Sequence, residues 1–125
     1  SLREPALAVL GRLGLAAKAD EPASRLGHGE QRQLELAMVL ATRPKMLLLD
    51  EPTAGMSRTE SRRMMGILRP LNGKVTILLV EHDMDVVFAL ADAITVLVKG
   101  KAIVTGPPAD VRANEDVRRA YLGNY

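Results

Sequence analysis

The sequence predicts an α/β fold, with a mostly parallel sheet flanked by helices. Two short and almost wholly apolar runs, Met46 to Asp50 and Val75 to Val80, are typical of central strands that are covered on both faces. The order strand, helix, strand, helix, strand from Met46 onward favours parallel pairing. With 125 residues, of which 47% are hydrophobic, the chain is long enough for one modest core.

The first third of the chain is predicted to form two helices joined by a loop. Leucines at three-residue spacing predict a helix from Pro5 to Leu13 that ends near Gly14. The following segment is rich in alanine, charged residues and helix breakers, so we expect a connection there. The second helix follows Gly29 and ends before Pro44. Its predicted apolar face consists of Leu34, Ala37, Met38 and Ala41.

Local signals mark the boundaries of the later elements. Ser57 and Glu60 form a capping-box pattern that begins a helix, and Pro70 is expected to end it. Asp83 is placed to cap the helix that follows the second strand. The runs 94–98 and 102–106, joined by Lys-Gly-Lys, predict a hairpin, and a short helical tail is expected after the two prolines that follow it.

The composition excludes several classes of function. Seventeen basic residues against 15 acidic ones give a net charge of +2, which is too small to indicate a nucleic-acid-binding protein. Because there are no cysteines, disulfides and thiolate metal sites are excluded, and a cytosolic setting is the default. No apolar run approaches the roughly 20 residues of a membrane-spanning helix, and the first residues lack a signal-peptide pattern. We therefore expect any link to a membrane to run through a partner.

Polar residues follow both predicted strands at the point where each one ends. Asp50 and Glu51 close the first strand, and His82 comes shortly after the second. Ligands of open parallel sheets bind at this edge. Because adjacent residues of an extended chain point in opposite directions, one carboxylate would hold a metal through water while the other orients or deprotonates a water molecule. This division suits phosphoryl transfer around Mg²⁺, but each residue alone is equally typical of a solvated strand end or a surface histidine.

A glycine-containing loop, Gly27-His28-Gly29, directly precedes the second helix. The amino terminus of a helix presents unpaired backbone N–H groups and the positive end of the helix dipole, so an anion such as phosphate can bind there. A sharp turn of the chain calls for glycine equally well. The loop alone therefore leaves both interpretations open.

Four motifs in a fixed order resemble the second half of an ABC transporter ATPase. LGHGEQ resembles the ABC signature motif, MLLLDEP resembles Walker B with its catalytic glutamate, AGMS resembles the D-loop, and LLVEHD resembles the segment with the switch histidine. The resemblance implies a partial P-loop NTPase fold, that of the ABC ATPases. Residues 1–42 would be part of the helical signature subdomain, and residues 43–125 would be the carboxyl-terminal part of the α/β ATPase core.

Within that superfamily, the sequence looks most like the ATPase subunits of branched-chain amino acid importers. The similarity lies in LGHGEQRQLELAMVLATRP, in DEPTAGMS, in LLVEHDMDVVFALADAITVLVKG and in VRRAYLG. Urea-type importers and the lipopolysaccharide-export ATPase share much of this pattern. The resemblance implies ATP-driven dimer closure with a second ATPase subunit, identical or different, and membrane-spanning permease subunits as further partners. The subunit would lie in the cytoplasm, peripheral to the inner face of the cell membrane.

The family's functional residues map onto this chain motif by motif. By resemblance, Asp50 supports Mg²⁺ through water, Glu51 polarises the attacking water, and His82 contacts the γ-phosphate of ATP. The signature residues would face ATP held by the opposite subunit: Leu26, Gly27, His28, Gly29 and Glu30. The D-loop residues would contact the partner across the dimer: Ala54, Gly55, Met56 and Ser57.

The chain departs from the family pattern in two respects. No phosphate loop of the form GxxxxGKS/T occurs in the 125 residues, and without its amides and lysine tight MgATP binding is not expected. We therefore expect a fragment of a longer subunit that is inactive alone. Gly27 stands where the signature usually has serine, so a hydroxyl donor to phosphate is missing. The alternatives are a non-catalytic module that self-associates through apolar surfaces and an unrelated small α/β binding domain.

Overall fold

The computed structural model describes residues 1–123, and the chain divides into two compact units. The first unit is Ser1–Val80, and the second begins at Glu81. The expected subdomain boundary between residues 42 and 43 concerns family organisation and stays a prediction. The last two residues of the predicted ATPase core, 124–125, lie outside the described residues.

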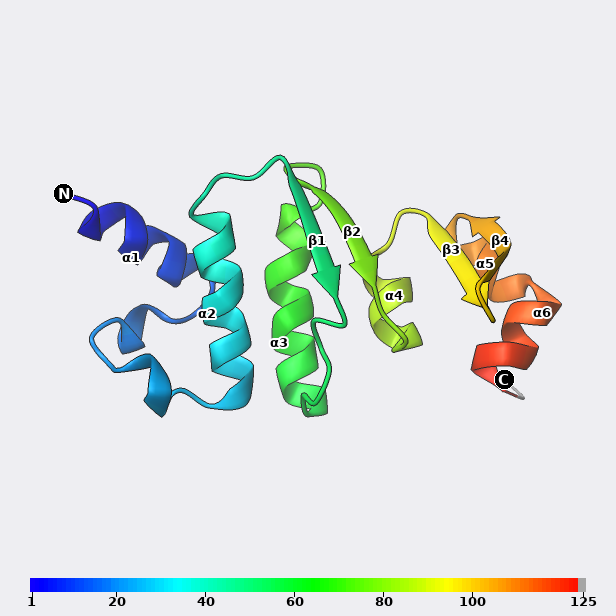
Figure 1. Ribbon diagram of the computed structural model, residues 1–125, viewed down its shortest axis with the longest axis horizontal. Helices are drawn as coiled ribbons and strands as arrows, with labels where there is room; N and C mark the ends of the chain where they lie inside the picture. Colours follow the sequence, from blue (N-terminus) through cyan, green and yellow to red (C-terminus); the bar gives the residue numbers. More distant parts are fainter. Residues whose placement is uncertain (124–125) are drawn as a thin grey trace. The chain divides into compact units, whose positions relative to one another are not determined.

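The first unit contains three α-helices and two strands (Figure 1). They are α1 (Arg3–Arg12), α2 (His28–Leu40), β1 (Met46–Asp50), α3 (Arg58–Leu68) and β2 (Thr76–Val80). Short 3₁₀ helices at Ala16–Lys18 and Ala23–Arg25 lie in the connection before α2, and another at Arg69–Leu71 follows α3. The elements predicted for this part of the chain are thus confirmed to within a residue or two.

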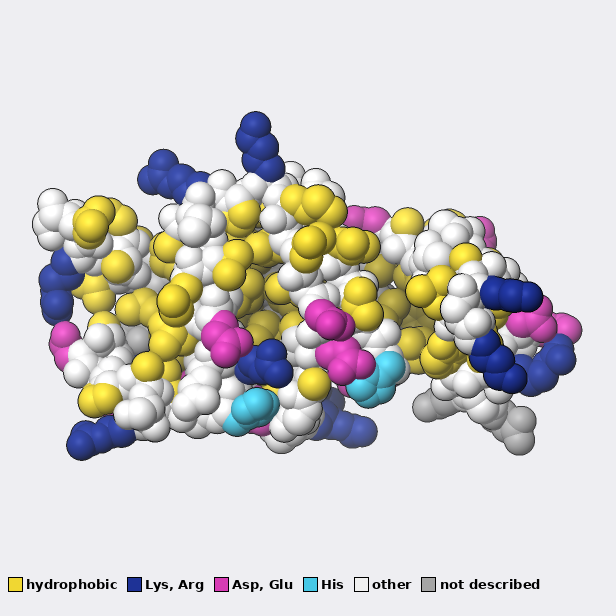
Figure 2. Space-filling view, viewed as in Figure 1, with side chains coloured by type: hydrophobic (Ala, Val, Ile, Leu, Met, Phe, Trp, Pro, Cys, Tyr) yellow, Lys and Arg dark blue, Asp and Glu magenta, His cyan; other side chains and the backbone are white. Residues whose placement is uncertain are grey.

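β1 and β2 form a parallel pair, as predicted, in register from Met46 opposite Thr76 to Asp50 opposite Val80. Only one face of this pair is well packed. Leu47 is 2% exposed, whereas Leu48 is 70% exposed, and Figure 2 shows hydrophobic side chains at the surface over these strands. The expectation that both faces are covered is therefore wrong here. An apolar run shows that both faces of a strand are able to be buried, but other helices or strands must pack against each face to bury it.

The buried stripe of α2 differs from the predicted apolar face. Its buried residues are Gly29, Gln33, Leu36 and Ala37. Met38 and Ala41, which were expected on the buried face, are exposed. The packed side of α2 includes a polar residue, Gln33. The face predicted from apolar residues alone is therefore rotated around the helix axis, toward solvent, from the face that is buried.

The predicted capping box begins α3. Ser57 Oγ accepts a hydrogen bond from the Glu60 N–H at 3.2 Å, and Glu60 Oε2 accepts one from the Ser57 N–H at 2.8 Å. Met64 and Leu68, one turn apart, are each 2% exposed and form the buried stripe. The α-helix ends before Pro70, which lies in the 3₁₀ turn that follows, because proline lacks the N–H that would continue the helix.

The second unit consists of a hairpin and short helices. They are α4 (Met84–Leu90), β3 (Ile94–Val98), β4 (Lys101–Gly106), α5 (Pro108–Ala113) and α6 (Glu115–Val117), followed by a π-helical turn at Arg118–Leu122. The buried core of this unit is formed by Ile94, Val96, Val111 and Val117.

β3 and β4 pair antiparallel, which confirms the predicted hairpin. The connecting residues Lys99 and Gly100 have φ angles of 50° and 78°, the left-handed pair that a two-residue hairpin turn requires. β3 therefore does not extend the parallel sheet, which consists of β1 and β2. The local turn made antiparallel pairing accessible to β3, so the predicted third parallel strand is wrong. Within residues 1–123, no helix is both long and apolar enough to cross a lipid bilayer.

Candidate functional site

The end of β1 presents two carboxylates on a constrained backbone. Asp50 lies opposite Val80, and the Glu51 N–H donates to the Val80 carbonyl at 2.7 Å. Both acidic side chains are exposed. Glu51 has a φ of +45°, a left-handed conformation that costs a residue other than glycine about 1–3 kcal/mol. Such strain persists only where the surrounding structure enforces it, and it is concentrated at functional sites.

The turn after Glu51 shows what enforces this conformation. The Ala54 N–H donates to the Glu51 carbonyl at 3.0 Å, and the Met56 N–H donates to the Thr53 carbonyl at 3.1 Å. Pro52 and Thr53 are buried, so the turn is anchored to the unit. The predicted D-loop is therefore a continuation of the same hydrogen-bonded turn that holds Glu51.

Asp50 is suited to a metal ion that is shared with a ligand. Among residues 1–123, no three histidine, cysteine, aspartate or glutamate side chains gather closely enough to hold an ion. Mg²⁺ typically keeps several waters and uses one or two carboxylates together with substrate phosphates. A single exposed aspartate at the end of a strand fits that mode, with contact to Mg²⁺ through water.

The predicted signature residues form the first turn of α2. Gly27 is the N-cap, with a φ of −65° that any residue adopts, so the turn itself does not require glycine there. Its N–H donates to Glu30 Oε1 at 3.2 Å, and Lys18 Nζ lies 2.6 Å from Glu30 Oε2. The Lys18 ammonium first, and the Gly27 N–H second, hold the pKa of the Glu30 carboxyl below its ordinary value. Glu30 is thus ionised and paired within its own unit. Leu26, which directly precedes Gly27, is buried.

His28 and Gly29 contact the D-loop and α3 within the same unit, where α2 and α3 both begin (Figure 1). His28 Nε2 lies 3.4 Å from the Ala54 carbonyl oxygen. Gly55 has a φ of +73°, and a Cβ there would meet the His28 ring at 3.4 Å. A Cβ on Gly29 would stand 2.8 Å from Glu60 Oε1, closer than real contacts allow. Glycine is therefore favoured at position 55 by its left-handed backbone, and at position 29 because a Cβ would have to displace the Glu60 carboxylate.

Glu60 belongs to this cluster, although the sequence assigned it only to capping. The Ser57 N–H and hydroxyl, with smaller contributions from His28 and the Gly29 N–H, hold the pKa of the Glu60 carboxyl below its ordinary value. A carboxylate of the same chain thus lies at the amino end of α2, where the sequence predicted phosphate. Local patterns could not reveal this contact, because it joins two helices that are distant in sequence.

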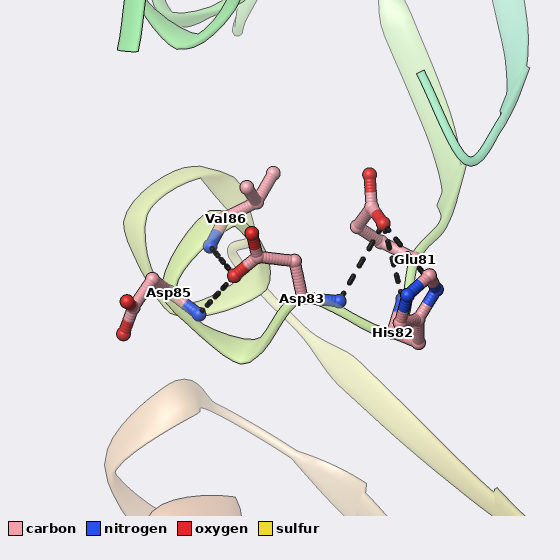
Figure 3. A network of polar contacts seen from close by, with 5 residues as sticks. All are labelled: Glu81, His82, Asp83, Asp85 and Val86. Atoms are coloured by element: carbon pink, nitrogen blue, oxygen red, sulfur yellow. Dashed lines mark hydrogen bonds and ion pairs between the residues drawn. The ribbon is translucent and has the colours of Figure 1, made fainter. Parts of the chain in front are cut away.

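His82 lies in the second unit, in the loop that leads into α4 (Figure 3). Its side chain is 70% exposed, and its Nδ1 is 3.9 Å from Glu81 Oε1. The His82 N–H donates to the same oxygen at 3.2 Å. Asp83 caps α4 as predicted, with its Oδ1 accepting from the N–H groups of Asp85 at 3.0 Å and Val86 at 3.5 Å. Glu81 was not recognised from the sequence, because a glutamate after a strand carries no signal of burial.

The structure brings two of the predicted segments together in the first unit, and the third belongs to the second unit. Residues 26–30 contact residues 54–57 in the first unit, and the latter continue the turn that begins at Glu51. His82 belongs to the second unit, two residues after Val80, the partner of Asp50 in the sheet. The arrangement offers an acid pair at a strand end and a helix amino terminus, which are parts that phosphoryl transfer uses.

Two family models match the chain, one toward each end. The model described as ABC transporter matches residues 2–54, and the model described as branched-chain amino acid ATP-binding cassette transporter matches residues 103–125. These matches make the chain similar to the ABC transporter ATP-binding family, which is the resemblance that its motifs predicted. Within this family, it resembles the ATP-binding proteins of branched-chain amino acid transport.

Individual relatives support both the similarity to ABC transporter ATP-binding proteins and the similarity to those of branched-chain amino acid transport. The high-affinity branched-chain amino acid transport ATP-binding protein LivG of Salmonella typhimurium is 42% identical over 116 residues, which cover 91% of this chain and 46% of LivG. Its counterpart BraF of Pseudomonas aeruginosa is 40% identical with the same coverage. Among solved structures, MJ1267, an ATP-binding cassette of an ABC transporter, matches with a TM-score of 0.83 at 30% identity, over 96% of this chain and 49% of MJ1267. The chain thus spans about half the length of the relatives it matches.

Proposed function

We propose that this chain is the carboxyl-terminal part of an ATP-hydrolysing subunit that powers an ABC importer for branched-chain amino acids. Its 42% identity to LivG favours this substrate class over urea-type import or lipopolysaccharide export. A second ATPase subunit and membrane-spanning permease subunits would be the partners, at the inner face of the cell membrane. Closure of the ATPase dimer would drive transport.

The observation that carries this proposal is the strained Glu51 directly after Asp50. Its φ of +45° holds an exposed carboxylate on a hydrogen-bonded turn directly after Asp50, and backbone strain of this kind is concentrated at functional positions. Bound MgATP supplies the phosphoanhydride bond and the charge-neutralising ion. Asp50 would support the ion through water, Glu51 would accept a proton from the attacking water, and His82 would donate to the γ-phosphate.

The first turn of α2 would act on nucleotide held by the partner subunit. The positive end of its helix dipole favours an anion. Nucleotide would compete there with the Glu30 and Glu60 carboxylates, which bind the N–H groups of Gly27 and Gly29. At Gly27 a Cβ would meet nothing closer than 3.5 Å, so the serine usual in the family would fit without displacement. The absent hydroxyl removes one hydrogen bond to a charged acceptor, worth about 1.5–3 kcal/mol. The D-loop, residues 54–57, would contact the partner across the same dimer.

ATP hydrolysis and nucleotide binding test the proposal directly. Residues 1–125 alone should release no phosphate from MgATP and bind it weakly or not at all, because the chain has no phosphate loop. The full-length subunit that contains this sequence should hydrolyse ATP, and Glu51→Gln should lower its turnover by about 10²–10⁴-fold while MgATP stays bound. Glu35→Gln, a matched change at an exposed carboxylate on α2, should leave turnover unchanged. Turnover that survives Glu51→Gln would contradict the catalytic role, and robust turnover by residues 1–125 would contradict the fragment's inactivity.

A second candidate function, self-association without catalysis, is favoured by the open face of the β1–β2 pair. Met46, Leu48, Leu78 and Val80 are between 51% and 70% exposed on these two strands. An apolar face of this kind marks an interaction site or an aggregation hazard. Light scattering across a concentration series should report dimers or larger species, and Leu48→Lys should dissociate them. A strictly monomeric chain would remove this candidate.

A further inference from the structure

The loop between β2 and α4 contains a buried carboxylate next to an exposed histidine. The side chain of Glu81 is 1% exposed, and that of His82 is 70% exposed. Burying an ionised carboxylate is costly unless donors surround it. The resemblance assigns no role to Glu81, although this residue lies within the LLVEHD motif. Its burial therefore needs a separate explanation.

Donors from the two following residues converge on one oxygen of Glu81 (Figure 3). Oε1 accepts from the His82 N–H at 3.2 Å and from the Asp83 N–H at 3.5 Å. The same oxygen lies 3.9 Å from His82 Nδ1. Glu81 therefore fixes the backbone of residues 82–83 and also faces one particular edge of the imidazole ring. All of these contacts lie within the second unit.

The two ring nitrogens of a histidine are distinct, and the partner of one determines the state of the other. A carboxylate facing Nδ1 favours a proton there, because it attracts the N–H dipole and, when the ring is charged, compensates the positive charge. Nε2 lies on the opposite edge of the exposed ring, away from the carboxylate. A proton on Nε2 is what a donor to phosphate needs.

We infer that Glu81 is a positioning residue for His82. It holds a proton on Nδ1 and makes Nε2 the nitrogen that meets a phosphate oxygen, with the carboxylate balancing the charge of the doubly protonated ring. Asp83 supports this arrangement, because its side chain fixes the start of α4 while its N–H binds the same Glu81 oxygen. The phosphate part of the inference rests on the proposed function, whereas the assignment of the proton to Nδ1 does not.

Nitrogen-15 NMR of the histidine side chains tests the Nδ1 assignment in residues 1–125 without nucleotide. We expect the neutral ring of His82 to carry its proton on Nδ1, to keep it there in Glu81→Gln, which retains a side-chain oxygen at this position, and to move it to Nε2 in Glu81→Ala. His28, which lies in the first unit, is the internal control and should not change. A proton on Nε2 in the unmodified chain would overturn the inference.

The same spectra distinguish a loss of positioning from a loss of folding. If Glu81→Ala keeps the amide signals of α4 and still carries its proton on Nδ1, the inference is wrong. If that variant unfolds, the unmodified chain and Glu81→Gln decide the question, because both must carry the proton on Nδ1 for the inference to stand.

Kinetics of the full-length subunit test the consequence for phosphate. Glu81→Ala should lower kcat by about 10-fold, with a smaller change in KM for ATP, by analogy with the low end of the loss seen when a metal-ligating histidine loses its carboxylate partner. In a His82→Ala background, adding Glu81→Ala should cause no further loss, since Glu81 acts through His82. A further loss of the same size would overturn the positioning role. A subunit without any ATPase activity would instead contradict the proposed function, and the NMR result would stand unaffected.

Discussion

Glu51 and Glu81 each directly follow a strand of the same parallel pair, yet their surroundings are opposite. Glu51 is exposed on a backbone with a φ of +45°, whereas the Glu81 side chain is 1% exposed and bonded to the backbone of the next two residues. An exposed carboxylate on a strained turn is able to meet water and ligands. A buried one acts only on its neighbours. The environment, rather than the position at the strand end, therefore separates the two proposed roles.

The largest expected effect concerns the strand that positions Glu51. Leu47→Ala should lower the free energy of unfolding by about 2–5 kcal/mol, because Leu47 is 2% exposed and its removal leaves a cavity. Leu48→Ala, at the neighbouring position that is 70% exposed, should change it by less than about 0.5 kcal/mol. Urea unfolding followed by circular dichroism measures both. Equal losses would mean that the open face is covered in solution, and hence that the setting of Glu51 differs from the one described.

A smaller effect is expected beside Glu81, at the cap of α4. Asp83→Ala should destabilise this helix by about 0.5–2 kcal/mol, because the N–H groups of Asp85 and Val86 lose their acceptor. Asp83→Asn retains a side-chain oxygen and should cost much less. Amide hydrogen exchange at these two positions reports the difference. Equal protection in the two variants would show that the cap contributes little to holding this loop.

A still smaller effect, of opposite sign, is expected at Glu51. Glycine relieves the left-handed strain of about 1–2 kcal/mol but adds freedom to the unfolded chain, so Glu51→Gly should stabilise the first unit by less than about 1 kcal/mol. Glu81→Gly should destabilise the second unit, because its backbone donors lose their carboxylate. Thermal unfolding of both variants gives the two signs. A destabilising Glu51→Gly would remove the argument that strain marks this position.

The smallest expected effect is the pH dependence of the signature loop. Glu30 and Glu60 have pKa values below the ordinary 4.5, so the unfolded chain takes up these protons first. Their contribution to stability is complete above pH 4.5 and is lost as the pH falls through the lower pKa of each folded-state carboxyl. The protection of the Gly27 and Gly29 amides against hydrogen exchange, measured relative to the intrinsic rate at each pH, should fall in that range. Glu60→Gln should abolish the pH response at Gly29 and leave it at Gly27, and an unchanged response at Gly29 would contradict the contact.

Local sequence signals predicted much of the fold. The bounds of β1, the capping box of Ser57 and Glu60, the cap at Asp83 and the hairpin turn at Lys99-Gly100 all depend on residues within a few positions of one another. These features depend on hydrogen bonds and backbone angles of neighbouring residues, and the residue types alone indicate them. The hairpin of β3 was predicted, but its absence from the parallel pair and the exposure of Met38 and Leu48 were not, because these depend on which other segments pack against each element.

The candidate site divides in the same way. Asp50, Glu51 and His82 were singled out because polar residues after apolar strands are visible in a sequence. The strained φ of Glu51, the burial of Glu81 and the approach of Glu60 to Gly29 were not, since each arises from contacts with other parts of its unit. The chemical roles of all these residues stay predictions that the experiments above address.

The close approach of Gly29 to Glu60 limits how this protein could be recombined with its relatives. A chimera that imports a signature loop with a side chain at position 29 would force that side chain against a carboxylate already tethered by Ser57. Moving the glutamate aside would open the cap of α3 and disturb the turn that leads back to Glu51. The loop and the start of α3 therefore form one module for transplantation, and crossovers between residues 30 and 57 should fail more often than crossovers outside them.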